Sequence, residues 1–257
     1  MHFLFPSHPL RAAVIDDMFA GQRDALIAAS HTASLVPDAV ISGGKPLRNV
    51  AAGAVIVYRG WMLNAADYVR LDEAVRVTGA TLLTSPADYL ACHHLPNWYP
   101  LINEFTPETR VFPVTSDLER ELRSLVWDQF FVKDYVKSLK TSTGSMIRDP
   151  SMIGTVIEEM KHFRGEIEGG FCVRRVEPFV AESERRYFVF RGKPFAPAGE
   201  AIPPIVHAVA GRLASPFFSV DVIRRTDGAL RVVEVGDGQV SDLTGWSADE
   251  FSAIEWD

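Results

Sequence analysis

The chain has only two cysteines, Cys92 and Cys172, among its 257 residues. Two cysteines so far apart build neither a disulfide framework nor a metal-binding motif. No apolar run approaches the length of a membrane span. The first residues also lack the basic region and the small-residue cleavage site of a secretory signal. These absences favour a reduced, cytoplasmic location.

Positive charge is scarce in the sequence. Lysine and arginine number 26 against 33 aspartates and glutamates, which gives a formal net charge of −7. An acidic chain of this kind is not expected to have nucleic-acid binding as its main function. A phosphate-bearing ligand is still compatible, since a metal ion can supply the positive charge. Internal repeats and low-complexity segments are absent as well.

Hydrophobic residues make up 47% of the chain and charged residues 23%, as in an ordinary globular protein. A chain of 257 residues is long enough for one large domain or for two to three small ones. In its first part, strand-like and helix-like stretches alternate, which predicts a parallel or mostly parallel sheet. Strands are expected at 54–58 and 80–83, and helices at 16–31, at 65–78 and from Ser85 onward.

Arg59 directly follows the strand expected at 54–58. Ligands of parallel sheets bind beyond the carboxyl ends of the strands, so Arg59 is a candidate ligand for an anionic substrate group. The alternative is a surface arginine with an ordinary salt bridge. His93 and His94 are adjacent on an expected helix, where neighbouring residues do not share a face. We therefore do not expect these two histidines to bind a metal ion together.

Residues 95–110 are rich in proline, asparagine and threonine and mark the expected domain boundary. Beyond it, Lys133 lies among aromatic residues in a strand-like stretch at 130–136. A lysine in such a place needs an anionic partner to offset its desolvation. The hydroxyl-rich stretch at 138–145 has one glycine and lacks the spacing of a P-loop. It either cradles phosphates with its hydroxyl and N–H groups or forms a flexible exposed loop.

The stretch at 217–237 reads as two strands joined by Asp227 and Gly228. Asp-Gly between alternating apolar residues is a strong hairpin signal, because a type I′ turn needs positive φ at both central positions. Counting outward from this turn pairs Thr226 with Ala229. The same count places four valines on one face, which is expected to be the core side: Val220, Val222, Val233 and Val235.

On the other face, this register sets Asp221 directly opposite Glu234. Opposed Cβ atoms lie about 4.5–5.5 Å apart, where like charges destabilise a sheet. The two carboxylates therefore need a cation between them or a raised pKa on one of them. With no histidine or cysteine on the hairpin, Mg²⁺ fits better than Zn²⁺. Alternatively, a slip of one residue would put the two acids on opposite faces of a solvated hairpin.

The order of these motifs resembles that of the ATP-grasp superfamily, and within it the glutathione-synthetase-like and peptide-ligase-like enzymes. The chain looks like one of the small stand-alone bacterial or phage members, and the resemblance covers roughly residues 80–240. The similar stretches are FTPETR at 105–110, FFVKDY at 130–135, FCVRRVEPF at 171–179, ERRYFVFRG at 184–192 and SVDVIRRTDGALRVVEV at 219–235.

The resemblance implies how a nucleotide would be held. Lys133 and Arg186 would contact the ATP phosphates and carry the catalysis. Glu177 lies in the stretch that is similar to the lining of the adenine pocket, and Glu184 would bind the nucleotide sugar. The family's earlier ATP-binding lysine has no obvious counterpart in this sequence. Two lysines of the following loop are candidates to replace it: Lys137 and Lys140.

The resemblance also implies a metal site, with Asp221 and Glu234 as Mg²⁺ ligands. The family usually has asparagine two positions after the metal-binding glutamate, and here that position is Gly236. Asp237 or Gln239 would then supply the missing ligand. A second departure is the glycine-rich phosphate loop, which is reduced to one glycine.

The fold implied is α/β and α+β, with a pre-ATP-grasp α/β domain at 1–105 and two α+β lobes, at 106–180 and 181–257, that enclose the nucleotide. The implied function is an ATP-dependent carboxylate–amine ligase that forms an acylphosphate and releases ADP and phosphate. Arg59 and Arg174 are candidates to bind the acceptor carboxylate.

Two alternative functions stay open: an ATP-binding regulatory module, which the two departures favour, and an ATP-dependent phosphotransferase. The expected partners are small-molecule or peptide carboxylates and amines. Neither nucleic acid nor a membrane is expected as a partner, and a homodimer stays open.

Overall fold

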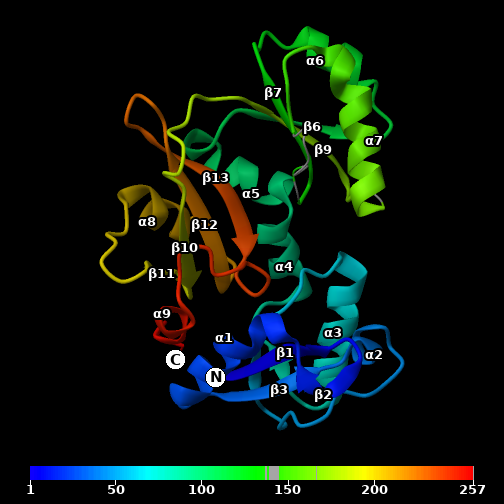
Figure 1. Ribbon diagram of the computed structural model, residues 1–257, viewed down its shortest axis with the longest axis vertical. Coiled ribbons are helices and arrows are strands. Elements are labelled where there is room, and N and C mark those ends of the chain that lie inside the picture. The colour runs from blue at the N-terminus through cyan, green and yellow to red at the C-terminus, as the bar shows by residue number, and fades with distance from the viewer. Residues whose placement is uncertain (137, 139–144, 166, 257) are drawn as a thin grey trace. The chain divides into compact units, whose positions relative to one another are not determined.

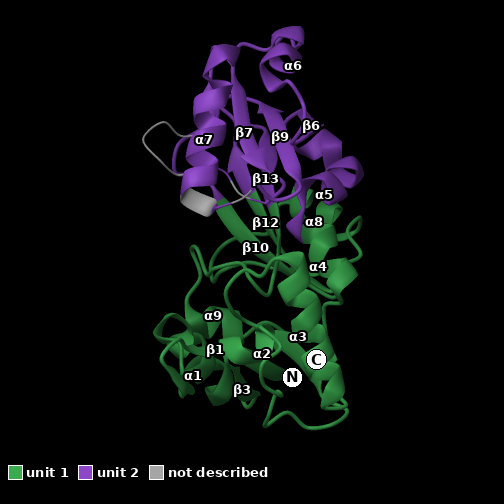
Figure 2. Cartoon of the chain, turned by 90° about the vertical axis from the view of Figure 1, so that its right-hand side faces the viewer, with its two compact units in different colours: residues 1–92, 185–221, 235–257 green, residues 93–184, 222–234 purple. Residues whose placement is uncertain are grey.

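The computed structural model describes residues 1–136, 138, 145–165 and 167–256. The chain forms two compact units, which Figure 2 shows in green and purple. Unit 1 comprises Met1–Cys92, Arg185–Asp221 and Val235–Asp257, and unit 2 comprises His93–Glu184 and Val222–Glu234. Each unit thus combines segments that are distant in the sequence. The three domains expected from the sequence, in contrast, follow one another along the chain.

The first sheet of unit 1 has five strands and is built around β1 (His2–His8) (Figure 1). β1 pairs in parallel with β3 (Thr32–Val36) and with β4 (Val55–Tyr58), and β4 pairs in parallel with β5 (Thr81–Leu82). β2 (Arg11–Ile15) runs antiparallel to β1. The mostly parallel sheet that the alternating pattern predicts is therefore confirmed.

Some helices of this part of the chain begin at a side-chain capping group, whereas α1 (Ala20–Ala28) and α2 (Asp38–Ile41) do not. Asn64, for example, accepts a hydrogen bond from the Asp67 N–H at 2.8 Å and so starts α3 (Ala65–Val77). Among the described residues, no helix is long and apolar enough to cross a membrane. The other helices up to residue 93 are η1 (Asp17–Phe19) and α4 (Pro86–His93).

Both faces of β1 are buried, as its run of apolar residues requires in a parallel sheet. Phe3 and Phe5 lie on one face, in an aromatic cluster that includes Trp256 from the C-terminal segment. The Trp256 ring centroid lies 5.1 Å from that of Phe3 and 5.0 Å from that of Phe190. On the other face, Leu4 packs with a cluster that includes four residues of β4 and α3: Ile56, Tyr58, Tyr68 and Leu71.

The second sheet has the strand order β11-β10-β12-β13. Its strands are β10 (Arg185–Phe190), β11 (Lys193–Phe195), β12 (Phe217–Arg224) and β13 (Leu230–Asp237), and the helices of this region are α8 (Pro204–Ala210) and α9 (Ala248–Ser252). Arg191 and Gly192 join β10 to β11 with φ of 48° and 77°, as a type I′ turn requires. The division between the units crosses β12 and β13, so the hairpin contributes to both.

The loop of this hairpin has three residues, so the predicted two-residue turn is wrong. The Arg225 N–H donates to the Ala229 carbonyl at 2.8 Å, and the Gly228 N–H donates to the Arg225 carbonyl at 2.9 Å. Gly228, with φ of +90°, supplies the left-handed residue that follows a type I turn in such loops. Ala229 therefore faces Arg225 and not Thr226. The predicted valine face changes as well, because Val232 is buried and Val233 only half-buried.

Unit 2 contains an antiparallel four-stranded sheet in the order β6-β9-β7-β8. Two of its helices cover one face, where Phe130, Val132, Phe171 and Val173 pack with Leu122 and Val156. The strands are β6 (Thr109–Pro113), β7 (Phe130–Asp134), β8 (Met146–Ile147) and β9 (Gly170–Arg175), and the helices are α6 (Leu118–Ser124), η3 (Pro150–Met152) and α7 (Ile153–Arg164).

The stretch at 95–110, which was expected to mark a domain boundary, forms α5 (Leu95–Ile102), η2 (Asn103–Phe105) and the start of β6. Pro96 is compatible with the helix because it stands in the first turn, where no backbone N–H is needed. Leu95, Trp98 and Ile102 are buried, so burial of one face stabilises a helix that the local composition does not predict.

A buried polar network joins the end of β13 to β4 and α3 within unit 1. The Gln239 side chain accepts from the Tyr58 N–H at 3.0 Å and donates to the Tyr68 hydroxyl at 2.6 Å. Asp237 Oδ1 accepts from the Gln239 N–H at 3.0 Å. Asp237 Oδ2 has no hydrogen-bond partner among the described residues. Burial raises the pKa of Asp237 to about 7, in spite of the hydrogen bonds from Gln239.

A first prediction concerns Gly169, which has φ of +75° and lies against Tyr135; an added Cβ would stand 2.2 Å from Tyr135 Cδ2. We expect Gly169→Ala to lower the free energy of unfolding by about 2 kcal/mol or more, seen as a lower thermal midpoint. Gly154→Ala in α7 is the matched control, because nothing lies within 4 Å of its Cβ. An equal effect of both substitutions would contradict the close packing at Gly169.

A second prediction concerns the pH dependence of stability. Because the folded-state pKa of Asp237 is raised to about 7, the folded protein binds more protons than the unfolded one between the ordinary aspartate pKa and about pH 7. Asp237 therefore stabilises the fold at low pH, and this contribution is lost as the pH rises to 7. Asp237→Asn should flatten the fall of the thermal midpoint between pH 4 and pH 7, measured in EDTA. Parallel curves of thermal midpoint against pH for the two proteins would refute a raised pKa of Asp237 in the folded state.

Candidate functional site

The pairing of β7 with β9 places two predicted site cations on one face of the unit 2 sheet. Phe131 pairs with Arg174 and Lys133 with Cys172, so these four residues share a face. It is the face opposite to the one that α6 and α7 cover. Lys133 and Arg174 are 4% and 5% exposed, which means that each cation needs acceptors within the protein.

Lys133 finds its acceptor on β13. Its Nζ lies 3.3 Å from Glu234 Oε1, and both residues belong to unit 2. The glutamate side chain is 46% exposed, whereas the lysine side chain is 5% exposed. A residue predicted to contact phosphate and a residue predicted to bind Mg²⁺ are thus in direct contact.

Arg174 also reaches β13. Its Nη1 donates to the Val233 carbonyl and its Nη2 to Thr106 Oγ1, and Nε has no hydrogen-bond partner among the described residues. Burial lowers the pKa of Arg174 to about 10, although Glu234 acts against this shift. These contacts fix β13 to the segment before β6, so they favour a structural role. Its binding of a substrate carboxylate stays a prediction.

Glu177 pairs with an arginine that the sequence did not single out. Arg231 Nε and Nη2 donate to the two carboxylate oxygens of Glu177 at 3.0 and 2.9 Å. The same guanidinium donates to the carbonyls of Glu104, at 2.7 Å, and Thr106, at 2.6 Å. A lone arginine among valines on a hairpin strand was the available signal. The predicted contact of Glu177 with adenine stays untested.

In unit 1, Asp221 and Arg186 form a bidentate ion pair. Arg186 Nε lies 2.8 Å from Asp221 Oδ1, and Nη2 lies 2.7 Å from Oδ2. The remaining nitrogen, Nη1, donates to the Asp242 side chain and, at 3.1 Å, to the Asp242 carbonyl. Two parallel charge-assisted bonds of this kind are among the strong hydrogen bonds of proteins. A residue predicted to contact phosphate again contacts a predicted Mg²⁺ ligand.

Arg59 is buried in unit 1 and surrounded by protein acceptors. Its Nε and Nη2 donate to Gln22 Oε1 at 3.2 and 2.8 Å. Nη1 donates to the carbonyls of Gly238 and Ser241, and the guanidinium carbon lies 4.6 Å from the ring centroid of Phe251. Burial lowers the pKa of Arg59 to about 9, against the attraction of Asp237. The alternative of a surface arginine with an ordinary salt bridge is therefore wrong, and binding of a substrate group by Arg59 stays a prediction.

The remaining predicted residues lie in different places. Glu184 is exposed and immediately precedes β10. Asp237 is fully buried in the network with Gln239. Lys137 and most of the stretch at 138–145 lie outside the described residues.

The oxygen donors have the chemistry that Mg²⁺ requires. Asp221 is a buried carboxylate, so it needs a cation beside it. Glu234 is a half-exposed carboxylate beside Lys133. Mg²⁺ usually takes one or two protein carboxylates and completes its shell with water and phosphate oxygens. Each carboxylate therefore has, in its own unit, the chemistry of a Mg²⁺ ligand. Among the described residues, no group of three or more histidine, cysteine, aspartate or glutamate side chains could hold a metal.

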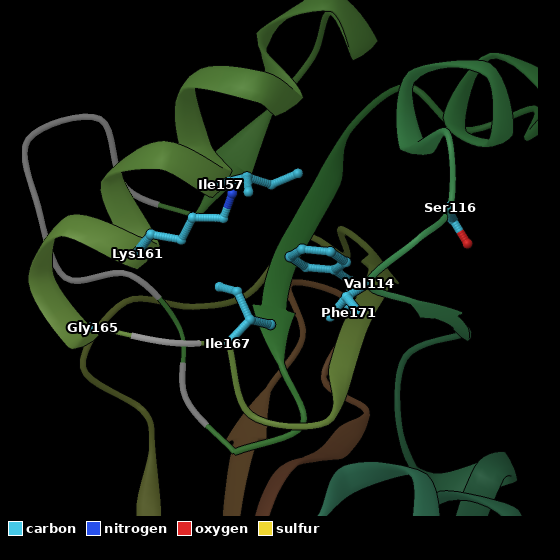
Figure 3. Close-up of a pocket in the computed structure, with 7 residues that line it drawn as sticks. All are labelled: Val114, Ser116, Ile157, Lys161, Gly165, Ile167 and Phe171. Carbon is cyan, nitrogen blue, oxygen red and sulfur yellow. The ribbon is translucent and has the colours of Figure 1, made fainter.

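A separate cavity of about 540 Å³ lies beside α7 in unit 2 (Figure 3). None of its lining residues belongs to the predicted site. Phe171 lies on the helix-covered face of the sheet, whereas Lys133 and Arg174 lie on the opposite face. The cavity is lined by Val114, Ser116, Ile157, Lys161, Gly165, Ile167 and Phe171.

The chain matches a family model described as ATP-grasp domain, R-two-K clade family 3, over residues 123–254. The matched region contains Lys133, Arg186, Asp221 and Glu234. A search of curated proteins finds no match.

Solved structures share the fold over nearly the whole chain. D-cycloserine synthetase DcsG is 15% identical, with a TM-score of 0.67 and coverage of 98% of this chain and 97% of that one. A RimK domain ATP-grasp protein from Sphaerobacter thermophilus is 18% identical, with a TM-score of 0.64 and coverage of 98% and 97%.

D-alanine–D-alanine ligase from Bacillus anthracis, complexed with ATP, is 13% identical, with a TM-score of 0.60 and coverage of 98% of this chain and 90% of that one. At such identities the likeness shows the fold alone, and it confirms the ATP-grasp architecture expected from the motifs. Because the family model covers more than half of the sequence, the chain belongs to family 3 of this clade of ATP-grasp domains.

Proposed function

We propose that the protein is an ATP-dependent ligase that joins a carboxylate to an amine. Two ion pairs carry this proposal: Lys133 with Glu234 in unit 2, and Arg186 with Asp221 in unit 1. Each joins a cation that suits phosphate to a carboxylate that suits Mg²⁺. Family membership supports ATP as the nucleotide, and two structural relatives, a D-cycloserine synthetase and a D-alanine–D-alanine ligase, support ligation.

In the proposed reaction, a substrate carboxylate attacks the γ-phosphate of ATP and ADP leaves. The amine then displaces phosphate from the acylphosphate to form the new bond. Mg²⁺, held by Asp221 and Glu234, would neutralise charge on the β- and γ-phosphates. Lys133 and Arg186 neutralise the non-bridging oxygens in the transition state. Phosphoryl transfer depends mainly on such positioning and charge neutralisation.

Before they can act on phosphate, both cations have to release their carboxylates. When the Lys133 pair opens, water can solvate Glu234, which is 46% exposed, but the 5% exposed lysine needs a phosphate oxygen in place of the carboxylate. The Arg186 pair is harder to open, since the Asp221 side chain is 5% exposed and would be left without a counter-charge. A Mg²⁺ ion held by Asp221 together with ATP would supply that counter-charge.

The other proposed contacts follow the family pattern. Glu184 holds the ribose, Glu177 lies by the adenine, and Lys137 assists at the phosphates. Asp237 is the proposed third carboxylate for Mg²⁺. Arg174 remains the proposed contact for the acceptor carboxylate.

A regulatory ATP-binding module is the second candidate function. Gly236 stands where the resembling enzymes carry a metal-binding asparagine. Gln239, one of the two residues that could replace it, has its side-chain oxygen and nitrogen engaged with Tyr58, Tyr68 and Asp237. An incomplete metal shell would permit nucleotide binding with little turnover.

The test is ADP release from ATP and Mg²⁺ in the presence of pools of carboxylates and amines. A ligase releases ADP and free phosphate only when both substrate pools are present. ATP-dependent thermal stabilisation without ADP from any pool would favour the regulatory module. A phosphorylated product without free phosphate would identify a phosphotransferase.

For Asp221 we expect Asp221→Asn to lower ADP release at least about a hundredfold, because it removes the charge proposed to hold Mg²⁺. Asparagine keeps the shape of the side chain and an oxygen for Arg186, so the thermal midpoint reports whether the fold persists. Asp227→Asn at the tip of the same hairpin is the control, since its side chain is 52% exposed and pairs only locally, with Arg225. Unchanged ADP release by a folded Asp221→Asn protein would refute the metal assignment.

For Lys133 we expect Lys133→Gln to lower kcat/KM for ATP by about tenfold to a thousandfold, through loss of a phosphate contact in a buried place. Lys193→Gln is the matched control, because Lys193 also stands in a strand and pairs with a glutamate, Glu255, but is 56% exposed. Initial rates over a range of ATP concentrations measure the effect. Equal losses in both variants would count against a phosphate contact of Lys133.

A further inference from the structure

Arg186 is held between two aspartates of very different exposure. Asp221 is buried on the neighbouring strand β12, whereas the Asp242 side chain is 77% exposed in the loop after β13. Arg186 uses Nε and Nη2 for Asp221 and Nη1 for Asp242, and all three residues belong to unit 1. Neither the family resemblance nor the sequence pattern singled out Asp242.

The contact with Arg186 occupies both oxygens of Asp221, at 2.8 and 2.7 Å. Each carboxylate oxygen has a second lone pair, so a metal ion could still use this carboxylate, but it would repel the guanidinium beside it. Binding of Mg²⁺ at Asp221 would therefore weaken the contact with Arg186 and favour its movement to the phosphates. The energy of that movement depends on which acceptors Arg186 keeps.

Asp242 is well placed to be the acceptor that Arg186 keeps. Its Oδ1 accepts from the Thr244 hydroxyl at 2.6 Å and from the Thr244 N–H at 3.2 Å, so its own loop fixes the carboxylate. Trp246 Nε1 donates to the Arg186 carbonyl at 2.9 Å and fixes the backbone of the arginine. With both the backbone and Nη1 held, the guanidinium can leave Asp221 by rotation of its side chain alone.

We propose that Asp242 is a positioning residue that retains Arg186 when its guanidinium leaves Asp221, and that it thereby lowers the Mg²⁺ concentration needed to load the site with nucleotide. This inference rests on the proposed function. While Arg186 is on Asp221, it has a bidentate partner in addition to Asp242. Once it has left, it keeps the contact with Asp242 described above, so loss of Asp242 costs more in the second state. Only such a difference between two states shifts a binding equilibrium.

The experiment is a Mg²⁺ titration of the full chain with a non-hydrolysable ATP analogue, followed by calorimetry and by the thermal midpoint. Asp242→Asn keeps the oxygen that Thr244 uses and removes only the charge. We expect it to raise the half-saturating Mg²⁺ concentration about threefold to fivefold, the size of an exposed ion pair. At about 1 M KCl, where charges more than about 3 Å apart are screened, the difference from the unaltered protein should shrink.

A control variant separates the charge of Asp242 from exposed charge in general. Asp249→Asn removes an exposed charge from α9 in the same C-terminal segment and should leave the Mg²⁺ dependence close to that of the unaltered protein. Thr244→Val removes the 2.6 Å bond that orients Asp242 and should give part of the shift seen in Asp242→Asn. An equal shift in Asp249→Asn and Asp242→Asn would overturn the proposal.

The remaining outcomes distinguish this inference from the proposed function. Binding of the analogue with the same Mg²⁺ dependence in Asp242→Asn would overturn the role of Asp242 and leave the ligase proposal standing. Failure of the unaltered protein to bind the analogue at any Mg²⁺ concentration would overturn both.

Discussion

The contacts of Arg174 and Arg231 with the segment around Thr106 fix the position of the hairpin in unit 2. Thr106 accepts from Arg174 with its hydroxyl and from Arg231 with its carbonyl. Arg231 stands on β13, and Arg174 binds the β13 carbonyl of Val233. A buried guanidinium is too costly to leave without acceptors, so these contacts have to form together. Glu234 follows directly on this fixed stretch, which is why it stands beside Lys133.

A comparable arrangement holds in unit 1. Arg59 binds two carbonyls of the loop after β13, and Arg186 binds the same loop at Asp242. Ser219 and Ser241 hydroxyls lie 2.7 Å apart and add a further link between β12 and this loop. The segment at 238–242 is therefore held by polar contacts that include those of Arg59, Arg186 and Ser219. Arg186 on β10, which is proposed to be catalytic, thus gains a fixed environment from a loop that itself carries no family motif.

The strands that carry the candidate site could be predicted because their signals are local. Lys133 in an aromatic strand, Arg186 before a run of apolar residues and two acids on an Asp-Gly hairpin are all visible within a few residues. The three-residue loop was missed because Thr226, Asp227 and Gly228 are compatible with both loop lengths, and the choice depends on pairing further along the strands. The helix α5 was missed because its prolines look like breakers, although Pro96 stands where a helix accepts it.

The partners of the site residues could not be predicted in the same way. Arg59 looked like an exposed cation, yet its acceptors include backbone carbonyls of Gly238 and Ser241, which have no sequence signature. Asp242 and Arg231 were missed for a related reason, because each acquires its role from residues more than 50 positions away. Such pairings depend on the fold and become visible only when the strands are assembled.

The position of Trp256 in the aromatic cluster has a consequence for the order in which the chain can fold during synthesis. Trp256 packs against Phe3 and Phe217, so the core of unit 1 contains residues from both extremes of the sequence. A ribosome releases the chain from its N-terminus, and one face of β1 must therefore stay partly uncovered until the C-terminal segment has left the exit tunnel. Contacts of such high sequence separation form late and slowly. During that wait, the exposed Phe3 and Phe5 would be natural binding sites for a chaperone that recognises apolar strands.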